Sequence, residues 1–438
     1  MNRNWNILVK NAFASVFALV LLASCSKVYF AGSLATIEDA QKNKASEVTF
    51  DVDWSAIGTD IPSEMTVLMS RIQNVTVHYA WRVNNMGEPI GPVTKSPYLF
   101  DNTSDAVTED QTGDDQISEE IPEDALAKEP MRVQHGLYTI MAVAAHSPED
   151  FEIERVERFQ DSLAYKVKDV YVRIPQVPKD ESYIDLNPGY EFLRSIQPLY
   201  FVGSDNTLVS SVIEGGIPLT MRKLTRRINF RITLRTETNS RTEGNEEVID
   251  TLETVFLDSL MAVVSGVPIK AQLMSGYVSE RSVGKMGFDL KKTGHTRVPG
   301  NDEIDHIFQG TYEGSINVFG LFPPADVEKV TGPGIINLFL YPKVYEERNG
   351  KLVEYSKLFH STLNLKNEIE KRNLMSPVPD RSEYILNGTD DVDLVVESDI
   401  ILSRKDVLSS TNQGLDKWNP NDVEPDEDGD RFNPGLEM

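Results

Sequence analysis

Cysteine is almost absent from this chain, since Cys25 is the only one among 438 residues. A single thiol cannot close a disulfide within the chain, and it cannot build a CxxC redox or metal motif. The fold therefore has no internal disulfide to rely on. The one thiol must serve another purpose, and its place directly behind an apolar run is the first indication of what that purpose is.

The motifs of several enzyme classes are missing as well. The sequence has no HExxH, GxSxG, GxxxxGK[ST] or GxGxxG, and its six histidines show no short zinc spacing. Two acidic groups come nearest to a metal site: Asp302, Glu303, Asp305 and His306, which we interpret as a polar loop, and Asp426–Asp430, which lacks the glutamate that closes a calcium loop. We predict no enzyme activity, no catalytic residue, no metal and no cofactor.

Basic residues are scarce relative to acidic ones. The chain carries 43 Lys and Arg against 68 Asp and Glu, a formal net charge of −25. Removal of residues 1–24 would take away Arg3 and Lys10 and no acid, which lowers the charge from −25 to −27. Nucleic-acid affinity depends on Lys and Arg displacing counterions, so such a polyanion is not expected to bind nucleic acid.

No apolar run is long enough to cross a bilayer as a helix, which takes about 20 residues. The most apolar run, residues 12–23, follows Arg3 and Lys10 and is followed by small residues. A basic start, a short apolar run and small residues are the layout of a secretory signal peptide, which we place at residues 1–24.

The residues at the end of this run, Leu22, Ala23, Ser24 and Cys25, resemble the bacterial lipobox. The resemblance implies that signal peptidase II cleaves before Cys25 and that the Cys25 thiol carries lipid. Two or three acyl chains hold a protein firmly at a membrane, whereas one holds it only marginally. We expect attachment to the outer membrane through Cys25. The sequence does not determine on which face of that membrane the protein lies. The alternatives are an ordinary signal peptide that contains a cysteine, or a buried core thiol.

Hydrophobic residues alternate with polar ones in many short segments, which predicts a mainly β protein. The expected strands are residues 48–54, 65–69, 75–83, 138–144, 165–174, 228–234, 261–264, 316–322, 335–345 and 392–402. Helical candidates are few and short, for example residues 148–159 and 367–374. The stretch Ser265-Gly266-Val267-Pro268 is expected to form a turn.

Composition and hydrophobic pattern divide residues 25–438 into a tether, two predicted domains and a tail. Residues 25–46 lack strong periodicity and are interpreted as a lipidated tether. Residues 47–215 and 216–403 are predicted to be an N-terminal and a C-terminal β-sandwich domain. Within the first, residues 101–124 hold many acids and no Lys or Arg, and are predicted to form a solvated loop. Residues 404–438 are rich in Pro, Gly, Asn and acid, which predicts a flexible acidic tail.

The start of the second predicted domain is locally basic. Its apolar residues recur every second position, so a strand with an apolar core face and a cationic outer face is expected. The basic residues are Arg222, Lys223, Arg226, Arg227, Arg231 and Arg235. The cationic face would suit an acidic partner, such as loop 101–124 or a neighbouring subunit. Plain solvation of an edge strand is the simpler interpretation, and we favour it.

Several of these segments, taken in order, resemble the fimbrillin-like lipoproteins of Gram-negative anaerobes, a superfamily of fimbrial stalk, tip and anchor subunits and uncharacterised lipoproteins. The matching stretches are VTFDVDWS (48–55), EMTVLM (64–69), HGLYTIMAVAAHS (135–147), MRKLTRRINFRITL (221–234), SLMAVVSGVPI (259–269) and INVFGLFPP (316–324). The resemblance implies two tandem transthyretin-like β-sandwich domains. It also implies assembly by β-strand addition, in which a strand of one subunit completes a sheet of another.

The chain departs from the stalk subunits of that superfamily in two ways. It has no convincing counterpart of the site at which their N-terminal strand is removed. It ends in an acidic segment instead of a clear apolar donor strand, so residues 392–402 are either a donor or a strand of the chain's own sandwich. An anchor or accessory subunit keeps its lipid and needs no cleavage, which suits this sequence better.

We therefore expect a lipid-anchored cell-envelope protein, a fimbrial anchor or accessory subunit or an adhesion subunit, whose partners are the membrane and other fimbrial subunits. The alternative is an outer-membrane carbohydrate-binding lipoprotein of a polysaccharide-uptake system. A glycan would need exposed aromatic rings, for which Trp54 and Trp81 are the candidates. Both lie in alternating segments, so packing in the core is the simpler role.

Overall fold

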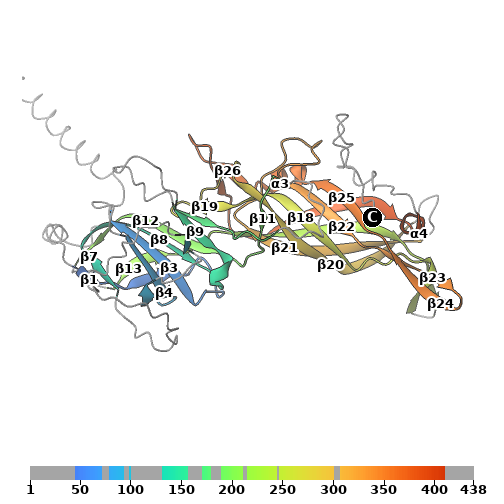
Figure 1. The fold of residues 1–438 in the computed structure, drawn as a ribbon, viewed down its shortest axis with the longest axis horizontal. Coiled ribbons are helices and arrows are strands. Elements are labelled where there is room, and N and C mark those ends of the chain that lie inside the picture. The colour runs from blue at the N-terminus through green and yellow to red at the C-terminus, as the bar shows by residue number, and fades with distance from the viewer. Residues whose placement is uncertain are drawn as a thin grey trace, which may run out of the picture.

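The computed structural model describes residues 45–71, 78–92, 98–99, 131–155, 170–178, 189–210, 215–243, 246–299 and 306–409. These residues are mainly β, as the alternation predicted. The chain forms an elongated molecule with two lobes along its longest axis, the N-terminal strands in one and the C-terminal strands in the other (Figure 1). Among the described residues, no helix has the length and apolar character needed to span a membrane.

The N-terminal lobe is built on one antiparallel sheet of six strands. Their order is β14 (Arg222–Lys223), β12 (Tyr200–Val209), β8 (Gly136–Ala144), β3 (Glu64–Arg71), β4 (His78–Asn84) and β5 (Pro89–Pro92). Two short pairs pack on this sheet: β1 (Ala45–Glu47) with β7 (Arg132–Gln134), antiparallel, and β2 (Phe50–Asp53) with β13 (Ile217–Thr220), parallel. Buried residues from both layers, including Val67, Ile140, Phe50 and Leu219, form one core between them.

The C-terminal lobe contains a longer sheet. Its strand order is β25 (Phe359–Asn364), β22 (Ile335–Leu340), β18 (Ser259–Pro268), β20 (Val283–Pro299), β21 (His306–Val318), β15 (Arg226–Glu237) and β28 (Val392–Leu402). The first part of β20 pairs with β18 and its last part pairs with β21, so this strand passes from one half of the sheet to the other. The second core cluster includes apolar residues of both halves, such as Leu338 and Phe230.

A small sheet joins the two lobes. Its order is β19 (Lys270–Gln272), β10 (Val170–Arg173), β9 (Glu152–Arg155) and β6 (Tyr98–Leu99), so one strand from the C-terminal half pairs with strands from the N-terminal half. β11 (Phe192–Leu193) also runs parallel to β20. Residues of the N-terminal sheet such as Leu68 and Met141 belong to the same core cluster as the C-terminal strands. Backbone pairing and apolar packing therefore both connect the lobes.

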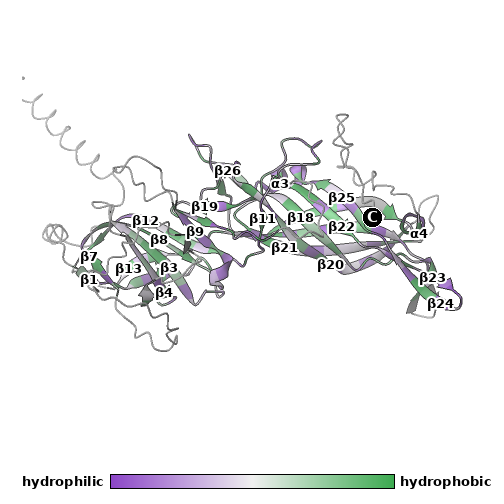
Figure 2. Cartoon of the chain, viewed as in Figure 1, coloured by the Kyte–Doolittle hydropathy of each residue, from purple (hydrophilic) through white to green (hydrophobic). Residues whose placement is uncertain are grey.

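Short elements complete the fold. They are the hairpins β16 (Ser240–Glu243) with β17 (Glu246–Ile249), β23 (Lys343–Arg348) with β24 (Lys351–Ser356), and β26 (Met375–Pro377) with β27 (Tyr384–Leu386), the 3-10 turns η2 (Pro148–Asp150) and η3 (Thr251–Glu253), and the helices α3 (Lys366–Arg372) and α4 (Arg404–Leu408). Along the strands, hydrophobic and hydrophilic residues alternate (Figure 2), as half-buried sheets require.

Two predicted elements are wrong. The helix expected at residues 148–159 is only the turn η2, after which β9 begins at Glu152 and pairs with β10. The turn expected at Ser265–Pro268 is part of β18, which continues past a β-bulge at Gly266. In contrast, the helix expected at residues 367–374 is confirmed as α3.

Strand pairing crosses the predicted domain boundary after residue 215. β13 and β14 follow that boundary in the sequence, yet they pair with β2 and β12 of the N-terminal lobe. The first residues of the predicted tail, Arg404–Leu408, form helix α4. The division into two transthyretin-like domains stays a prediction. The predicted signal peptide, loop 101–124, the tail from residue 410 and the predicted tether up to residue 44 lie outside the described residues. The last two residues of the predicted tether, Ala45 and Ser46, belong to β1.

Candidate functional site

β15 has the two faces that the sequence predicted. Ile228, Phe230, Ile232 and Leu234 are buried in the core, and the residues between them point away from it. Arg227 and Arg231 lie on that outer face and are exposed. Because β28 and β21 flank β15 on either side, this face is a continuous sheet surface of three strands.

Most basic side chains of this region have partners within the chain. Arg231 Nε donates to Glu313 Oε1 at 2.7 Å, and Arg235 Nε donates to Gln309 Oε1 at 3.2 Å. Arg226 donates to the backbone carbonyls of Asp390 and Asn387. The Arg222 guanidinium lies 4.8 Å from the centroid of the Phe201 ring, a cation–π contact. Most of these basic side chains therefore have partners within the chain, although only Arg231 of the four has a carboxylate partner among these contacts.

An open hollow of about 300 Å³ lies on this face, and polar side chains line most of it: Arg227, Asn229, Arg231, Glu313, Ser315 and Asp393. Asn229 Nδ2 donates to Asp393 Oδ1 at 2.9 Å, which links β15 to β28. Arg227 forms no hydrogen bond or ion pair with any residue that the structure describes. The hollow thus offers a guanidinium, an amide, a hydroxyl and carboxylates to a polar ligand or to a partner's side chains.

Sequence reasoning identified Arg227 and Arg231 but missed the other polar residues of the hollow. Asn229 and Asp393 each stand between buried apolar neighbours, and Glu313 and Ser315 stand on either side of Gly314, next to buried Tyr312 and Ile316. That alternation places each side chain on an outer face. It does not indicate which strands lie next to each other, and this is why the hollow could not be found from the sequence.

β28 is a strand of this chain's own sheet. It runs parallel to β15 from Ile228–Val392 to Thr236–Leu402, with a bulge between, and Leu394 and Leu402 are fully buried. β15 is its only partner among the described strands, so its other side is a sheet edge. Residues 392–402 were predicted to be either a donor strand or a strand of the chain's own sandwich. In the described fold they are a strand of the chain's own sheet.

Helix α4 closes the end of β28. Ser403 Oγ accepts from Asp406 N at 3.2 Å, while Asp406 Oδ2 accepts from Ser403 N at 3.0 Å, which forms a capping box. Arg404 N donates to Glu237 Oε2 at 2.6 Å, and Val407 is buried. These contacts attach the end of β28 to the end of β15.

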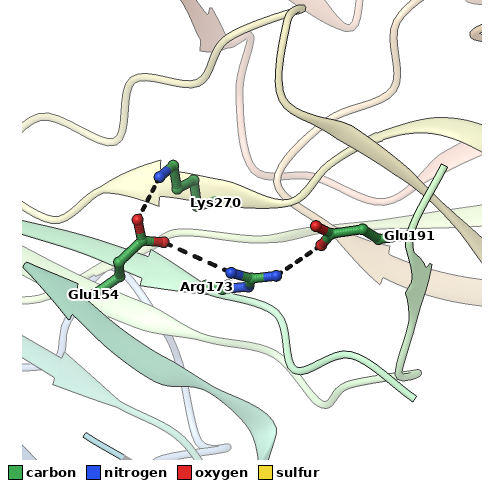
Figure 3. Close-up of polar contacts among 4 residues, drawn as sticks. All are labelled: Glu154, Arg173, Glu191 and Lys270. Atoms are coloured by element: carbon green, nitrogen blue, oxygen red, sulfur yellow. Dashed lines mark hydrogen bonds and ion pairs between the residues drawn. The ribbon is translucent and has the colours of Figure 1, made fainter. Parts of the chain in front are cut away.

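The junction of the lobes holds a network of four charged residues that sequence reasoning also missed. Arg173 of β10 lies between two carboxylates, with Nη2 2.7 Å from Glu191 and Nη1 4.0 Å from Glu154 of β9 (Figure 3). Lys270 Nζ of β19 is 2.6 Å from the other carboxylate oxygen of Glu154. The side chains of Glu154, Arg173 and Lys270 are about one quarter exposed, at 23%, 23% and 26%.

The remaining candidates from the sequence do not form a chemical site in the described part of the chain. Leu22, Ala23, Ser24, Cys25, Asp302, Glu303, Asp305 and Asp426–Asp430 lie outside it, and His306 begins β21. No group of three or more metal-ligating side chains occurs among the described residues.

The two candidate tryptophans pack on the N-terminal core. Trp54 is 9% exposed, its ring meets Tyr200 edge-on at 6.4 Å, and its Nε1 donates to the carbonyl of Asn85 at 3.0 Å. Trp81 is half-buried and packs against the same core. Trp54 is therefore a core residue.

Comparisons with known proteins give structural neighbours only. No protein-family profile and no curated protein sequence matches this chain. It is similar to the crystal structure of a putative adhesin from Bacteroides ovatus, at 10% identity and a TM-score of 0.37, over 84% of this chain and 96% of that one. It is also similar to the fimbrial anchor protein Mfa2 from Porphyromonas gingivalis, at 11% identity and a TM-score of 0.31, over 80% and 91% of the two chains.

A fimbrial assembly protein from Parabacteroides distasonis is a third neighbour, at 10% identity and a TM-score of 0.24, over 74% of this chain and 97% of that one. These neighbours are adhesin-type and fimbrial proteins.

Proposed function

We propose that this chain is an exported lipoprotein without enzyme activity, held at the outer membrane by lipid on Cys25, that serves as a fimbrial anchor or accessory subunit or as an adhesion subunit. The observation that carries the proposal is the stretch Leu22-Ala23-Ser24-Cys25 behind a short apolar run, in a chain that otherwise lacks cysteine. The elongated β architecture suits a protein that extends from a membrane anchor toward partners.

Fractionation of Cys25→Ser tests the anchor. The native chain should partition with membranes and carry acyl groups by mass spectrometry, while Cys25→Ser should be unlipidated and released from them. Ser26→Thr is the control, since it changes the residue after the thiol and keeps Leu22, Ala23, Ser24 and Cys25. If Cys25→Ser remains with the membrane fraction, or if the Cys25 sulfur of the native chain is bare, the anchor is wrong.

We propose that partners add a strand to the free edge of β28. An edge strand presents unpaired backbone N–H and C=O groups that another chain can pair with. Residues Val392–Glu397 are the regular part of this edge, because the bulge lies beyond them. The hollow with Arg227 lies beside the same stretch, so an incoming segment would meet side-chain donors as well as the backbone.

Proline scanning tests the edge without removing the strand. N–H groups point to opposite sides at successive residues, so one of Val395→Pro and Val396→Pro removes an N–H from the free edge while the other breaks pairing with β15. The variant that keeps the native unfolding midpoint is the informative one. It should lose co-purification with fimbrial subunits. If it co-purifies like the native chain, strand addition at β28 is wrong.

Glycan binding is the second candidate, and the polar hollow is the observation that favours it. A panel of glycans should be tested with the native chain, Arg227→Ala and Trp81→Ala. Loss of measured binding in Arg227→Ala would place a glycan in the hollow, and loss in Trp81→Ala would place it on the N-terminal lobe. Absence of binding to the whole panel would leave the fimbrial proposal standing alone.

A further inference from the structure

The C-terminal sheet has an apolar stripe on the face that points away from the core. Alternate residues of β22 belong to the core: Ile336, Leu338 and Leu340. Phe339 therefore lies on the opposite face. Its neighbours across the sheet are Met261 on β18 and His360 on β25, and Val263 lies one step farther along β18 on the same face.

This stripe is buried although it belongs to neither core. Phe339 is 1% exposed, Val263 5% and His360 7%. None of the three is a member of either core cluster. The Phe339 and His360 rings contact each other, with centroids 4.9 Å apart. Side chains on an outer sheet face become this buried only when another part of the chain covers them.

The described residues account for the cover at one end of the stripe. Asn364, opposite Ile335, donates through Nδ2 to the carbonyls of Asp326 and Lys329, so the loop before β22 lies over that end. Phe339 is four residues along the strand from Ile335, about 13 Å away at 3.3 Å per residue. These contacts therefore lie at the far end of the stripe from Phe339 and His360.

The chain leaves the described structure next to this second end. Ser409 is the last described residue, and its carbonyl accepts from Lys357 Nζ at 3.3 Å. Lys357 stands two residues before β25, and its ammonium lies 5.4 Å from the centroid of the Phe359 ring. The 29 residues that follow Ser409 (438 − 409) therefore begin beside Lys357, which is three residues before His360 in the sequence.

The segment after Ser409 contains a tryptophan, which is suited to an apolar face beside a histidine. It reads TNQGLDKWNPNDVEPDEDGDRFNPGLEM from Thr411, and Trp418 is its only tryptophan. Trp418 is the ninth residue after Ser409, and an extended chain spans up to about 3.3 Å per residue. The indole can therefore reach the stripe, while the acids that follow it would stay in solvent.

We propose that residues 410–438 dock on the outer face of β22 and β25, with Trp418 packed over Phe339 and His360. The tail is then a cover built into the chain and not a free appendage. β25 is an edge strand, so the docked tail also lies beside a second edge of the C-terminal sheet. A partner that uses this face would have to displace the tail. This inference does not depend on the lipid anchor or on strand addition at β28.

Cysteine cross-linking tests the contact in the full chain. Cys25→Ser gives a background without cysteine, to which Thr362→Cys on the outer face of β25 and Asn419→Cys beside Trp418 are added. We expect an intramolecular disulfide, seen as a faster band on a non-reducing gel. Thr311→Cys with Asn419→Cys is the matched control, since Thr311 lies on β21 in the other half of the sheet. Equal cross-linking of the two pairs, or none of either, overturns the proposal.

The pKa of His360 provides a second readout. Burial lowers the pKa of His360 to about 3. In the full chain, the His360 ring protons should therefore not titrate above pH 5 in NMR spectra. In a chain that ends at Ser409, the pKa should rise above 5, because the His360 ring loses its cover. Trp418→Ala in the full chain makes the same test if the shortened chain does not fold. A pKa that stays below 5 in either folded variant contradicts the proposal.

Discussion

Lys270 Nζ lies 2.6 Å from Glu154 Oε1, and this pair joins strand β19 of the C-terminal half to strand β9 of the N-terminal half. The same ammonium lies 4.9 Å from the centroid of the Tyr171 ring. Glu154 also has Arg173 nearby, which in turn binds Glu191. Because the side chains of Lys270 and Glu154 are only about one quarter exposed, solvent screens this pair less than a surface pair.

Replacement of Lys270 should weaken the junction. Lys270→Met keeps most of the aliphatic stem but leaves a Glu154 oxygen without its donor, so we expect the free energy of unfolding to fall by about 1–2 kcal/mol. Urea unfolding measures the change. Lys371→Met is the control: Lys371 is 67% exposed and 3.5 Å from Glu368, and its loss should cost less than about 0.5 kcal/mol. An equal loss of unfolding free energy in the two variants would show that the junction pair stabilises the fold no more than an exposed surface pair.

Gly266 should tolerate no side chain. It has a φ of +88°, and a Cβ there would lie 2.6 Å from the backbone nitrogen of Gly334. Gly266→Ala is expected to lower the free energy of unfolding by about 2–4 kcal/mol, from backbone strain plus overpacking. Gly294→Ala, also in a bulged strand but with open space around it, should change the free energy by less than about 1 kcal/mol. Thermal unfolding of both variants makes the comparison.

The bulge at Gly266 also shows where local sequence reasoning reaches its limit. A Ser-Gly-Val-Pro stretch is a common turn signal. Here Ser265 pairs with Lys285 before the bulge and Val267 pairs with Gly284 after it, so β20 holds the chain extended on both sides. Gly266 has the positive φ that is typical of a turn, but here it forms a β-bulge within the strand. Only the neighbouring strand distinguishes the two outcomes.

The mistaken helix at residues 148–159 has a similar origin. Pro148, Glu149 and Asp150 are residues typical of a first helical turn, and Ser147 Oγ does accept from Glu149 N, as an N-cap does. The turn ends there because Ile153 pairs with Val172 and is buried in the shared core. Tertiary packing overrides the local preference. By contrast, β15 and β28 were predictable because apolar residues alternate with polar ones along them, and β8 because it is a short apolar run, which is buried almost throughout.

The polar sites were beyond prediction because their partners are distant in the sequence. Glu154 and Lys270 are 116 residues apart, and Asn229 and Asp393 are 164 apart. Alternation shows that each side chain leaves the core face of its strand. Strand order, which brings the partners together, follows from the whole topology and cannot be read from any one segment.

Ser403 should matter for helix α4 more than for the rest of the molecule. Ser403→Ala removes the oxygen that accepts from Asp406 N, a loss that costs about 1 kcal/mol at an N-cap. We expect faster hydrogen exchange over residues 404–409, while the exchange of β8 stays as it is. Ser403→Thr keeps a hydroxyl and is the control. If the alanine and threonine variants exchange alike, the capping box does not hold the end of β28.

His360 should make stability depend on pH. Burial lowers its pKa to about 3 in the folded chain, against about 6.5 in an unfolded one. The unfolded chain therefore binds one more proton between these values, so the stabilisation is complete above pH 6.5 and falls as pH decreases toward 3. The slope is about 1.4 kcal/mol per pH unit, or about 2 kcal/mol between pH 6.5 and 5. In urea unfolding, the native chain should lose that much more than His360→Gln over this range. Parallel pH profiles of the two chains would show that His360 is not buried in solution.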